Sequence, residues 1–164
     1  MQKSLLFLFL FSSFFGFSQK KLDKLLKAHN TESIPYIYIE DLKSYPSDII
    51  LLDARESKEY ATSHLKDAIP VGYDFFNMDS VLPKLPDKDS KIVVYCSLGI
   101  RSEDIAEKLK KAGYKNIFNL YGGIFEWKNN NLKVYNLKEQ ETDSVHTFNK
   151  DWSKWLKKGI KIYE

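Results

Sequence analysis

The sequence predicts an α/β fold with a central parallel sheet of four to five strands and helices on both faces. Short apolar runs of strand length alternate along the chain with segments of helical periodicity, a pattern that is typical of parallel sheets. Two of the runs, residues 49–52 and 92–95, are apolar throughout, as expected for strands that are buried on both faces. The 164 residues, of which 43% are apolar, suffice for one domain with its own core.

The first 18 residues are predicted to be a secretory signal peptide and not a part of the fold. After a short basic start, residues 5–17 form an apolar run that is shorter than the roughly 20 residues of a membrane span. The small residues Gly16 and Ser18 indicate cleavage near Ser18–Gln19. We therefore expect a periplasmic or secreted protein without stable membrane insertion; the alternative is an uncleaved segment that stays as a membrane anchor.

A helical lead-in is predicted at residues 19–33, because Leu22, Leu25 and Leu26 repeat at helical spacing. The predicted domain follows at residues 34–134. Its strands are expected at residues 49–52, 68–71, 91–95 and 117–120, with an alternating apolar stretch at 34–39. Each has the length and apolar character of a strand, and Pro70 confines the second of them to a strand end or a sheet edge.

The helices of this domain are expected at residues 40–45, 56–62, 75–82, 102–112 and 122–127. The fourth has Ile105 and Leu109 on one face and ends before Gly113, since glycine is common just past a helix end. Prolines and aspartates at residues 83–89 predict a polar turn, and the asparagines at 129–131 end the last helix.

The remaining residues, 135–164, form a C-terminal extension of different character. Residues 139–144 predict a polar linker, Trp152 and Trp155 share a helical face, and residues 160–163 alternate as in an edge strand. We expect the helix and the strand to pack back onto the domain. The alternative is an appendage that binds a partner.

Composition excludes several classes of protein. Charged residues make up 29% of the chain, mix both signs and leave a net charge of +3; a nucleic-acid-binding protein more often shows a strong basic stripe, so no such partner is expected. Cys96 is the only cysteine, which excludes an internal disulfide. The three histidines lack metal-ligand spacing, so no metal site is expected, and His29 and His146 are expected at the surface.

The loop from Cys96 to Arg101 directly follows the clearest strand and leads into a helix that begins near Ser102. In open parallel sheets, ligand sites lie at the carboxyl ends of strands. Backbone N–H groups and a helix dipole at such a turn stabilise a sulfur anion, so the pKa of the Cys96 thiol should fall below its usual value of about 8.5. Gly99 permits a tight turn, and Arg101 could hold the loop or bind an anion. A buried, inert thiol is the alternative.

Four ordered motifs resemble the pattern of single-domain rhodaneses. They are C-S-L-G-I-R-S at residues 96–102, D-A-R-E-S-K-E-Y at 53–60, S-H-L-K-D-A-I-P at 63–70, and L-Y-G-G at 120–123 followed by Trp127. The resemblance covers residues 36–134 and implies a single rhodanese-like domain. Ser63 and Asp67 stand where the family usually has glycine, which bears on local turn geometry more than on catalysis.

The resemblance implies a two-step sulfur transfer with Cys96 as the catalytic nucleophile. Its thiolate takes the outer sulfur of a small donor such as thiosulfate and becomes a persulfide, which a thiol or cyanide acceptor then attacks. This covalent catalysis needs no metal and no organic cofactor, and the loop amides would stabilise the persulfide anion. The residues implied in binding substrate or persulfide are Ser97, Leu98, Gly99, Ile100, Arg101 and Ser102.

Four polar residues of the upstream motifs, Asp53, Arg55, Glu59 and His64, are predicted to support the structure, with a catalytic set as the alternative. Arg55 and Glu59 lie four residues apart and could pair at a helix start. His64 could order the turn that follows it. A structural role is favoured for all four, because polar groups at buried turns need partners. Asp53 ends its strand and is the one of the four that could approach the loop.

Three rival functions are open at this point. Cysteine-dependent phosphatases and arsenate reductases resemble C-x-x-x-x-x-R, whereas four residues separate Cys96 from Arg101 here and form a narrower cradle. A non-catalytic rhodanese-like module usually lacks the cysteine. A redox thiol would form intermolecular disulfides, since the chain has one cysteine. The loop is also neutral and partly apolar at Ser97, Leu98 and Ile100, so its side chains bind a doubly charged donor weakly. The physiological donor could therefore differ from thiosulfate.

Overall fold

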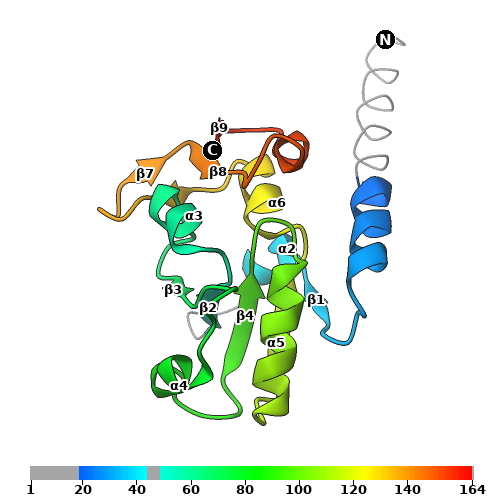
Figure 1. Ribbon diagram of the computed structural model, residues 1–164, viewed down its shortest axis with the longest axis vertical. Coiled ribbons are helices and arrows are strands. Elements are labelled where there is room, and N and C mark those ends of the chain that lie inside the picture. The colour runs from blue at the N-terminus through cyan, green and yellow to red at the C-terminus, as the bar shows by residue number, and fades with distance from the viewer. Residues whose placement is uncertain (1–18, 44–48, 164) are drawn as a thin grey trace, which may run out of the picture. The chain divides into compact units, whose positions relative to one another are not determined.

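The structure is a computed structural model that describes residues 19–43 and 49–163, and the predicted signal peptide lies outside this part. The chain divides into two units, residues 1–31 and 32–164. In the first unit, residues 19–29 form a helix, drawn in blue in Figure 1, where the leucine spacing predicts one. Among the described residues, no helix has the length and apolar character that crossing a membrane requires.

The second unit is built on a five-stranded parallel sheet, as the sequence predicts (Figure 1). In spatial order its strands are β1 (Tyr36–Ile37), β5 (Ile117–Leu120), β4 (Lys91–Tyr95), β2 (Ile49–Asp53) and β3 (Ile69–Pro70). Asp53 pairs with Tyr95 on one side and with Pro70 on the other, so three strands end at the same level. Pro70 lies on an edge strand, where its missing N–H breaks no ladder.

Helices flank the sheet, and β4 is buried between its two covered faces. The helices are α2 (Ile39–Lys43), α3 (Ser57–Thr62), α4 (Met78–Val81), α5 (Arg101–Lys111) and α6 (Gly123–Asn129), with a 3-10 helix, η1, at Leu82–Lys84. Ile92 and Val94 of β4 join Leu52, Ile105 and Leu109 in the main core cluster. Val93 and Tyr95 point to the opposite face and are equally buried, because successive side chains of a strand alternate.

The helix predicted at residues 75–82 begins later and is shorter. Asn77 is the N-cap of α4, where its side-chain oxygen accepts a hydrogen bond of 2.9 Å from the Asp79 amide. Phe75 is 90% exposed and contributes nothing to an apolar helical face. Pro83, which was expected in a turn, lies in the first turn of η1, where proline loses no hydrogen bond. The short helix predicted at residues 40–45 is α2, and its last two predicted residues lie outside the described part.

The extension differs from its prediction. The expected linker at residues 139–144 holds strand β7 (Glu141–Thr142), which pairs antiparallel with β6 (Val134–Tyr135). It then enters β8 (Ser144–His146), which pairs in parallel with β9 (Ile160–Ile162). The predicted helix is a 3-10 turn, η2 (Trp152–Trp155). The prediction of a linker was wrong because these polar residues belong to strands. Their side chains face solvent, and the strands that pair with them lie elsewhere in the sequence.

The prediction that the extension packs back onto the domain is confirmed. Val145 and Leu156 are fully buried, and β8 contacts α3. His64 and Tyr135 exchange two backbone hydrogen bonds of 2.8 and 2.9 Å, which joins the extension to the end of α3. Figure 1 shows β7, β8 and β9 beside α3 and α6, above the carboxyl end of β4. His146, expected at the surface, is 7% exposed because it lies in β8, which pairs with β9 and packs beside α3.

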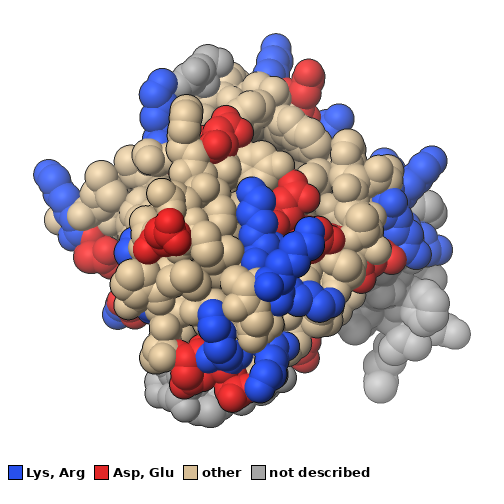
Figure 2. All heavy atoms as spheres, turned by 60° about the horizontal axis from the view of Figure 1, so that its bottom comes forward, with Lys and Arg blue, Asp and Glu red and all other residues tan. Residues whose placement is uncertain are grey.

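The face at the bottom of Figure 1, where the strands begin, comes forward in Figure 2. There, basic side chains gather near the centre and acidic ones lie directly beside them. This mixture agrees with the net charge of +3. The expectation that no nucleic acid binds stays a prediction.

Candidate active site

The Cys96 thiol lies at the carboxyl end of β4, inside the loop that leads into α5. It is 2% exposed, and its Sγ accepts a hydrogen bond of 3.1 Å from the Gly99 amide. Gly99 has φ 109°, a conformation that side chains rarely permit. Burial alone raises the pKa of Cys96, but the Arg101 charge, the Ser102 hydroxyl and the backbone amides outweigh it and hold the pKa below its ordinary value. The thiol is therefore poised to ionise.

Asn119 of β5 holds the loop from behind, although the sequence did not single it out. It is fully buried, its Oδ1 accepts from the Ser102 hydroxyl at 2.7 Å, and its Nδ2 donates to the Gly99 carbonyl at 2.8 Å. The Ser102 oxygen also lies 3.5 Å from Cys96 Sγ. A hydroxyl has one proton to give, so Asn119 and the sulfur compete for it. The signal in the sequence is a polar residue inside an otherwise apolar strand.

The N-terminus of α6 holds the loop carbonyls and keeps them away from the sulfur. The amide of Ile124 donates to the Cys96 carbonyl at 2.9 Å, and that of Phe125 donates to the Ser97 carbonyl at 3.2 Å. A Cβ on Gly123 would lie 2.2 Å from the Cys96 carbonyl oxygen, so only glycine fits there. The Gly122–Gly123 pair therefore permits the close approach that turns the loop amides inward.

Glu59 of α3 pairs with Arg101, not with Arg55 as the spacing of four predicted. Arg101 Nη1 donates to Glu59 Oε2 at 2.7 Å and Nη2 donates to Oε1 at 2.8 Å. Ser97 joins them: its hydroxyl lies 3.2 Å from Glu59 and 3.1 Å from Arg101 Nη2. Burial raises the pKa of Glu59, but its bonds to Arg101 and the charges around it lower the pKa overall. Arg101 thus braces the loop, one of the two roles that the sequence left open.

Asp53 and Arg55 form a separate, fully buried pair beneath the loop. Arg55 Nε and Nη2 donate to the Asp53 carboxylate at 2.9 and 2.6 Å, and Nη2 also donates to the Ser63 carbonyl at 2.6 Å. Arg55 lies two residues from Asp53 on a buried turn and pairs with it. Glu59 therefore pairs with Arg101 and not with Arg55. The Asp53 carboxylate therefore faces Arg55, and it does not line the pocket at Cys96.

His64 lies apart from the thiol. Its ring stacks on Tyr60 with centroids 4.0 Å apart, and Nδ1 lies 3.1 Å from the Tyr60 carbonyl. Nε2 reaches the Glu139 carboxylate at 3.4 Å. These contacts and the backbone bridge to Tyr135 tie α3 to the extension. The four polar residues thus have three different places: Glu59 braces the loop, Asp53 and Arg55 form a buried turn, and His64 connects α3 to the extension.

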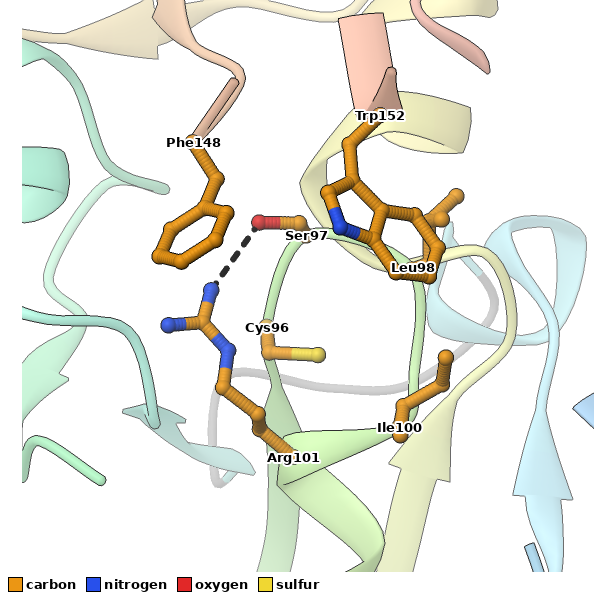
Figure 3. A pocket seen from close by; sticks show the side chains of 7 residues that line it. All are labelled: Cys96, Ser97, Leu98, Ile100, Arg101, Phe148 and Trp152. Carbon is orange, nitrogen blue, oxygen red and sulfur yellow. Dashed lines mark hydrogen bonds between the residues drawn. The ribbon is translucent and has the colours of Figure 1, made fainter. Parts of the chain in front are cut away.

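A pocket of about 160 Å³ opens on Cys96 (Figure 3). It is lined by Cys96, Ser97, Leu98, Ile100, Arg101, Phe148 and Trp152. The two aromatic residues come from the extension, and Figure 3 shows Phe148 beside the Arg101 guanidinium and Trp152 beside Leu98. The sequence predicted the packing of Trp152 but gave no sign that the extension would cover this loop. Among the residues that the structure describes, no group of His, Cys, Asp or Glu could hold a metal ion.

Residues 38–130 match the model of the rhodanese-like domain, which is more than half of the chain. The chain belongs to the rhodanese family. A tRNA uridine(34) hydroxylase of Hamiltonella defensa is 33% identical over 114 residues, which are 68% of this chain and 30% of that protein. A hydroxylase of the same name from Sodalis glossinidius is 34% identical over 56% of this chain and 28% of its own length. The chain thus spans under a third of these curated relatives.

Solved structures show the same fold. A thiosulfate sulfurtransferase of Pseudomonas aeruginosa superposes with a TM-score of 0.59 at 22% identity, over 85% of this chain and 26% of that one. The rhodanese-like domain of an Anabaena protein gives 0.57 at 22% identity, over 65% of this chain and 82% of that one.

This rhodanese replaces two glycines of the family pattern, with different consequences. Ser63 has an extended backbone, φ −168°, which any residue adopts, while its buried hydroxyl has no hydrogen-bond partner among the described residues. Asp67 has φ 60°, the left-handed region in which glycine is unstrained. The family preference for glycine at position 67 therefore has a backbone cause, and this chain accepts the strain. Phe148 and Trp152 lie beyond the matched residues, 38–130.

Proposed function

We propose that this rhodanese is a sulfurtransferase that carries sulfur as a persulfide on Cys96. The observation that supports it best is the position of the Cys96 sulfur, 3.1 Å from the Gly99 amide at the base of an open pocket. Amides aimed at a buried anion are preorganised donors, and the lowered thiol pKa supplies the nucleophile. The family match supports chemistry of this class.

The first step forms the persulfide. The Cys96 thiolate attacks the outer sulfur of a donor such as thiosulfate; a new S–S bond forms while the donor's S–S bond breaks, and sulfite leaves with the bonding electrons. The terminal sulfur of the persulfide then carries the negative charge. The amides of the loop, which Asn119 and α6 keep in place, stabilise that charge.

The second step returns the enzyme to its starting state. An acceptor thiolate or cyanide attacks the terminal sulfur, and the S–S bond to Cys96 breaks with its electrons returning to the Cys96 sulfur. The product is an acceptor persulfide or thiocyanate, and the lowered pKa makes Cys96 a good leaving group. Neither step requires a metal or an organic cofactor.

Other activities have less support. The four-residue spacing between Cys96 and Arg101 and the full engagement of Arg101 by Glu59 leave little room for the tetrahedral oxyanion of a phosphatase. The name of the curated hydroxylases describes the whole of those proteins, and the segment shared with this chain covers 28–30% of their length. Their name suggests tRNA as a substrate that can be tested, but the geometry at Cys96 is stronger support for sulfur transfer.

We also propose that residues 1–18 direct export and are removed near Ser18–Gln19. The support is the short apolar run after a basic start. Producing the full sequence in a bacterial host and measuring the intact mass of the isolated protein tests this. A mass equal to residues 19–164 is expected in the periplasmic or secreted fraction, and a full-length mass in the membrane fraction would contradict it.

The same preparation tests the sulfur transfer. The protein is reduced and incubated with thiosulfate or mercaptopyruvate, and its intact mass is measured under non-reducing conditions. The Cys96→Ser variant is treated in the same way as a control. A gain of one sulfur atom, reversed by cyanide and absent from the variant, is expected. No gain from either donor would contradict the proposal, and a trapped mixed disulfide would favour a redox role.

A further inference from the structure

We propose that Phe148 and Trp152 form a subsite for the apolar organic group of the sulfur donor. The substrate class is an organic sulfane compound with at most one negative charge and an aromatic or other apolar group next to the transferable sulfur. The inference rests on the proposed persulfide chemistry at Cys96. It names the substrates that this pocket favours over the doubly charged thiosulfate.

The walls of the pocket are apolar. Leu98 and Ile100 of the loop face Phe148 and Trp152 of the extension, and the Cys96 sulfur lies among them (Figure 3). The volume is about 160 Å³, and an apolar cavity of roughly 150 Å³ binds benzene. The space therefore accepts a group of one ring while the attached sulfur meets Cys96.

The charges around the pocket disfavour a dianion. Of the described residues that line it, Arg101 alone is charged, and both of its terminal nitrogens donate to the Glu59 carboxylate. The pair is close to neutral, so the ionised Cys96 leaves the site with a net negative charge. Thiosulfate would bring two further negative charges towards that thiolate, whereas a singly charged donor with a ring meets less repulsion and buries apolar surface.

Phe148 is held in place at a cost in backbone strain. Its φ is 64°, which is unusual for a bulky residue and persists only where the surroundings enforce it. The buried His146 accepts a hydrogen bond of 3.1 Å from the Phe148 amide, and the Thr147 amide donates to the Ile162 carbonyl at 2.7 Å. Phe148 is 53% exposed, so core packing does not explain the position of its ring. Its position instead places it over Arg101, 5.9 Å from the guanidinium carbon.

Trp152 is placed by a local cap. The Asn149 side-chain oxygen accepts from the amides of Asp151 and Trp152 at 3.0 and 3.1 Å, at the start of η2. Ser153, the next residue, is buried and anchors the turn. A hydrogen-bonded turn therefore places the indole at the pocket, as a strained backbone places the ring of Phe148 there.

The reaction of such a donor balances without a further reagent. The Cys96 thiolate attacks the outer sulfur of benzenethiosulfonate, a Cys96 S–S bond forms, and the S–S bond of the donor breaks. Benzenesulfinate leaves with the electron pair. One negative charge enters with the donor and one leaves with the sulfinate, so the enzyme persulfide keeps the charge of the thiolate.

The test compares two thiosulfonates that differ in the organic group alone, with thiosulfate as the doubly charged donor. Persulfide formation on the isolated protein is timed by intact mass with benzenethiosulfonate, methanethiosulfonate and thiosulfate, and each rate is divided by that of a small free thiol with the same donor. We expect the benzene compound to be favoured over the methane compound by about ten-fold, the effect of burying part of a ring. Thiosulfate is expected to be the slowest of the three.

The variants Phe148→Ala and Trp152→Ala are measured in parallel, and each is expected to reduce this preference to about two-fold. Tyr163→Ala removes an aromatic side chain of the same extension that does not line the pocket, and it should keep the preference. Melting curves test whether each variant is folded. If Phe148→Ala misfolds, Trp152→Ala still tests the subsite independently.

Equal normalised rates for the two thiosulfonates, or a preference that survives both variants, would overturn the subsite. The absence of persulfide with all three donors would overturn the proposed sulfur transfer and the subsite with it. The two failures are distinguishable, because the first leaves persulfide formation intact.

Discussion

The loop from Cys96 to Arg101 and the C-terminal extension line the same pocket, but different forces hold them. In the loop, backbone carbonyls accept hydrogen bonds from buried partners, the Asn119 side chain and the amides at the N-terminus of α6. The extension takes part in two small two-stranded sheets, β6–β7 and β8–β9, and buries Val145 and Leu156. Its contributions to the pocket are the exposed Phe148 and the half-buried Trp152.

This contrast separates two tasks. Stabilising a sulfur anion requires donors at fixed distances in a water-poor site, which a network of buried polar groups provides. An apolar wall requires shape alone, and many side chains can supply it. Substitutions in the loop should therefore remove the chemistry, whereas substitutions in the extension should change stability or the choice of compound.

The largest effect is expected from removing the extension. A chain that ends at Asn136 loses Val145 and Leu156, both 0% exposed, and each buried side chain of this kind is worth about 1.5–3 kcal/mol. Denaturant titration should show a fall of about 4 kcal/mol in the free energy of unfolding. A chain that ends at Ile162 keeps both side chains and is the control. An unchanged stability on cutting at Asn136 would mean that the extension is an independent appendage.

The next effect tests the brace of the loop. Glu59→Gln leaves the Arg101 charge without its partner, and breaking a buried ion pair costs about 3 kcal/mol. Glu141→Gln makes the same change in the solvent-exposed pair of Lys133 and Glu141, whose side chains are 65% and 51% exposed, and a much smaller loss of stability is expected there. Glu59→Gln should also lower the KM for thiosulfate, because Arg101 is then free to meet a dianion. Equal losses of stability for the two variants would contradict a buried brace.

The pH dependence isolates the charge of Arg101. Burial raises the pKa of Cys96, and the Arg101 charge is the largest of the influences that lower it. The rate of persulfide formation should rise with pH as the thiol ionises, with a midpoint below that of an ordinary cysteine. In Arg101→Gln the midpoint should move upward. Lys115→Gln changes an exposed charge and should leave it in place; an unshifted midpoint in Arg101→Gln would show that the charge does not act on the thiol.

The lowered pKa also affects stability. Between the folded and the unfolded pKa of Cys96, the unfolded chain binds more protons, so the free energy of unfolding rises with pH in that interval. Below the folded pKa this contribution is lost. Comparing the pH dependence of stability in the parent and in Cys96→Ser measures it, and identical curves would contradict a lowered pKa.

The sequence predicted best what is decided locally. The strands at residues 91–95 and 117–120 match because continuous apolar runs suit buried parallel strands. The sequence indicated a site at Cys96 because a loop between a strand and a helix N-terminus brings backbone amides near the sulfur, although Asn119 and α6, which hold the loop, are distant in the sequence. Asp53 and Arg55 form a buried ion pair across two residues of one turn, and their structural role stays a prediction.

Long-range partners escaped prediction. The pairing of Glu59 with Arg101 joins residues 42 apart, and the rule for residues four apart on a helix pointed to Arg55 instead. Phe148 and Trp152 reach the pocket because β8 pairs with β9 and packs beside α3, and no local pattern encodes that pairing. Asn119 stands out in the sequence as a polar residue in an apolar strand, but its hydrogen-bond partners cannot be read from the sequence.

The smallest effect compares strain in the two regions, because Asp67 in the domain and Phe148 in the extension both have a left-handed backbone, with φ 60° and 64°. Relief of this strain gains roughly 1–2 kcal/mol, from which the greater flexibility of unfolded glycine subtracts about 0.5–1 kcal/mol. Asp67→Gly should therefore raise the free energy of unfolding by about 0.5 kcal/mol and leave donor preference unchanged. Phe148→Gly relieves the same strain but removes the ring, so any gain in stability should come with a weaker preference for aromatic donors. If both variants gained stability and both kept the preference, the strain at Phe148 would have no connection with the pocket.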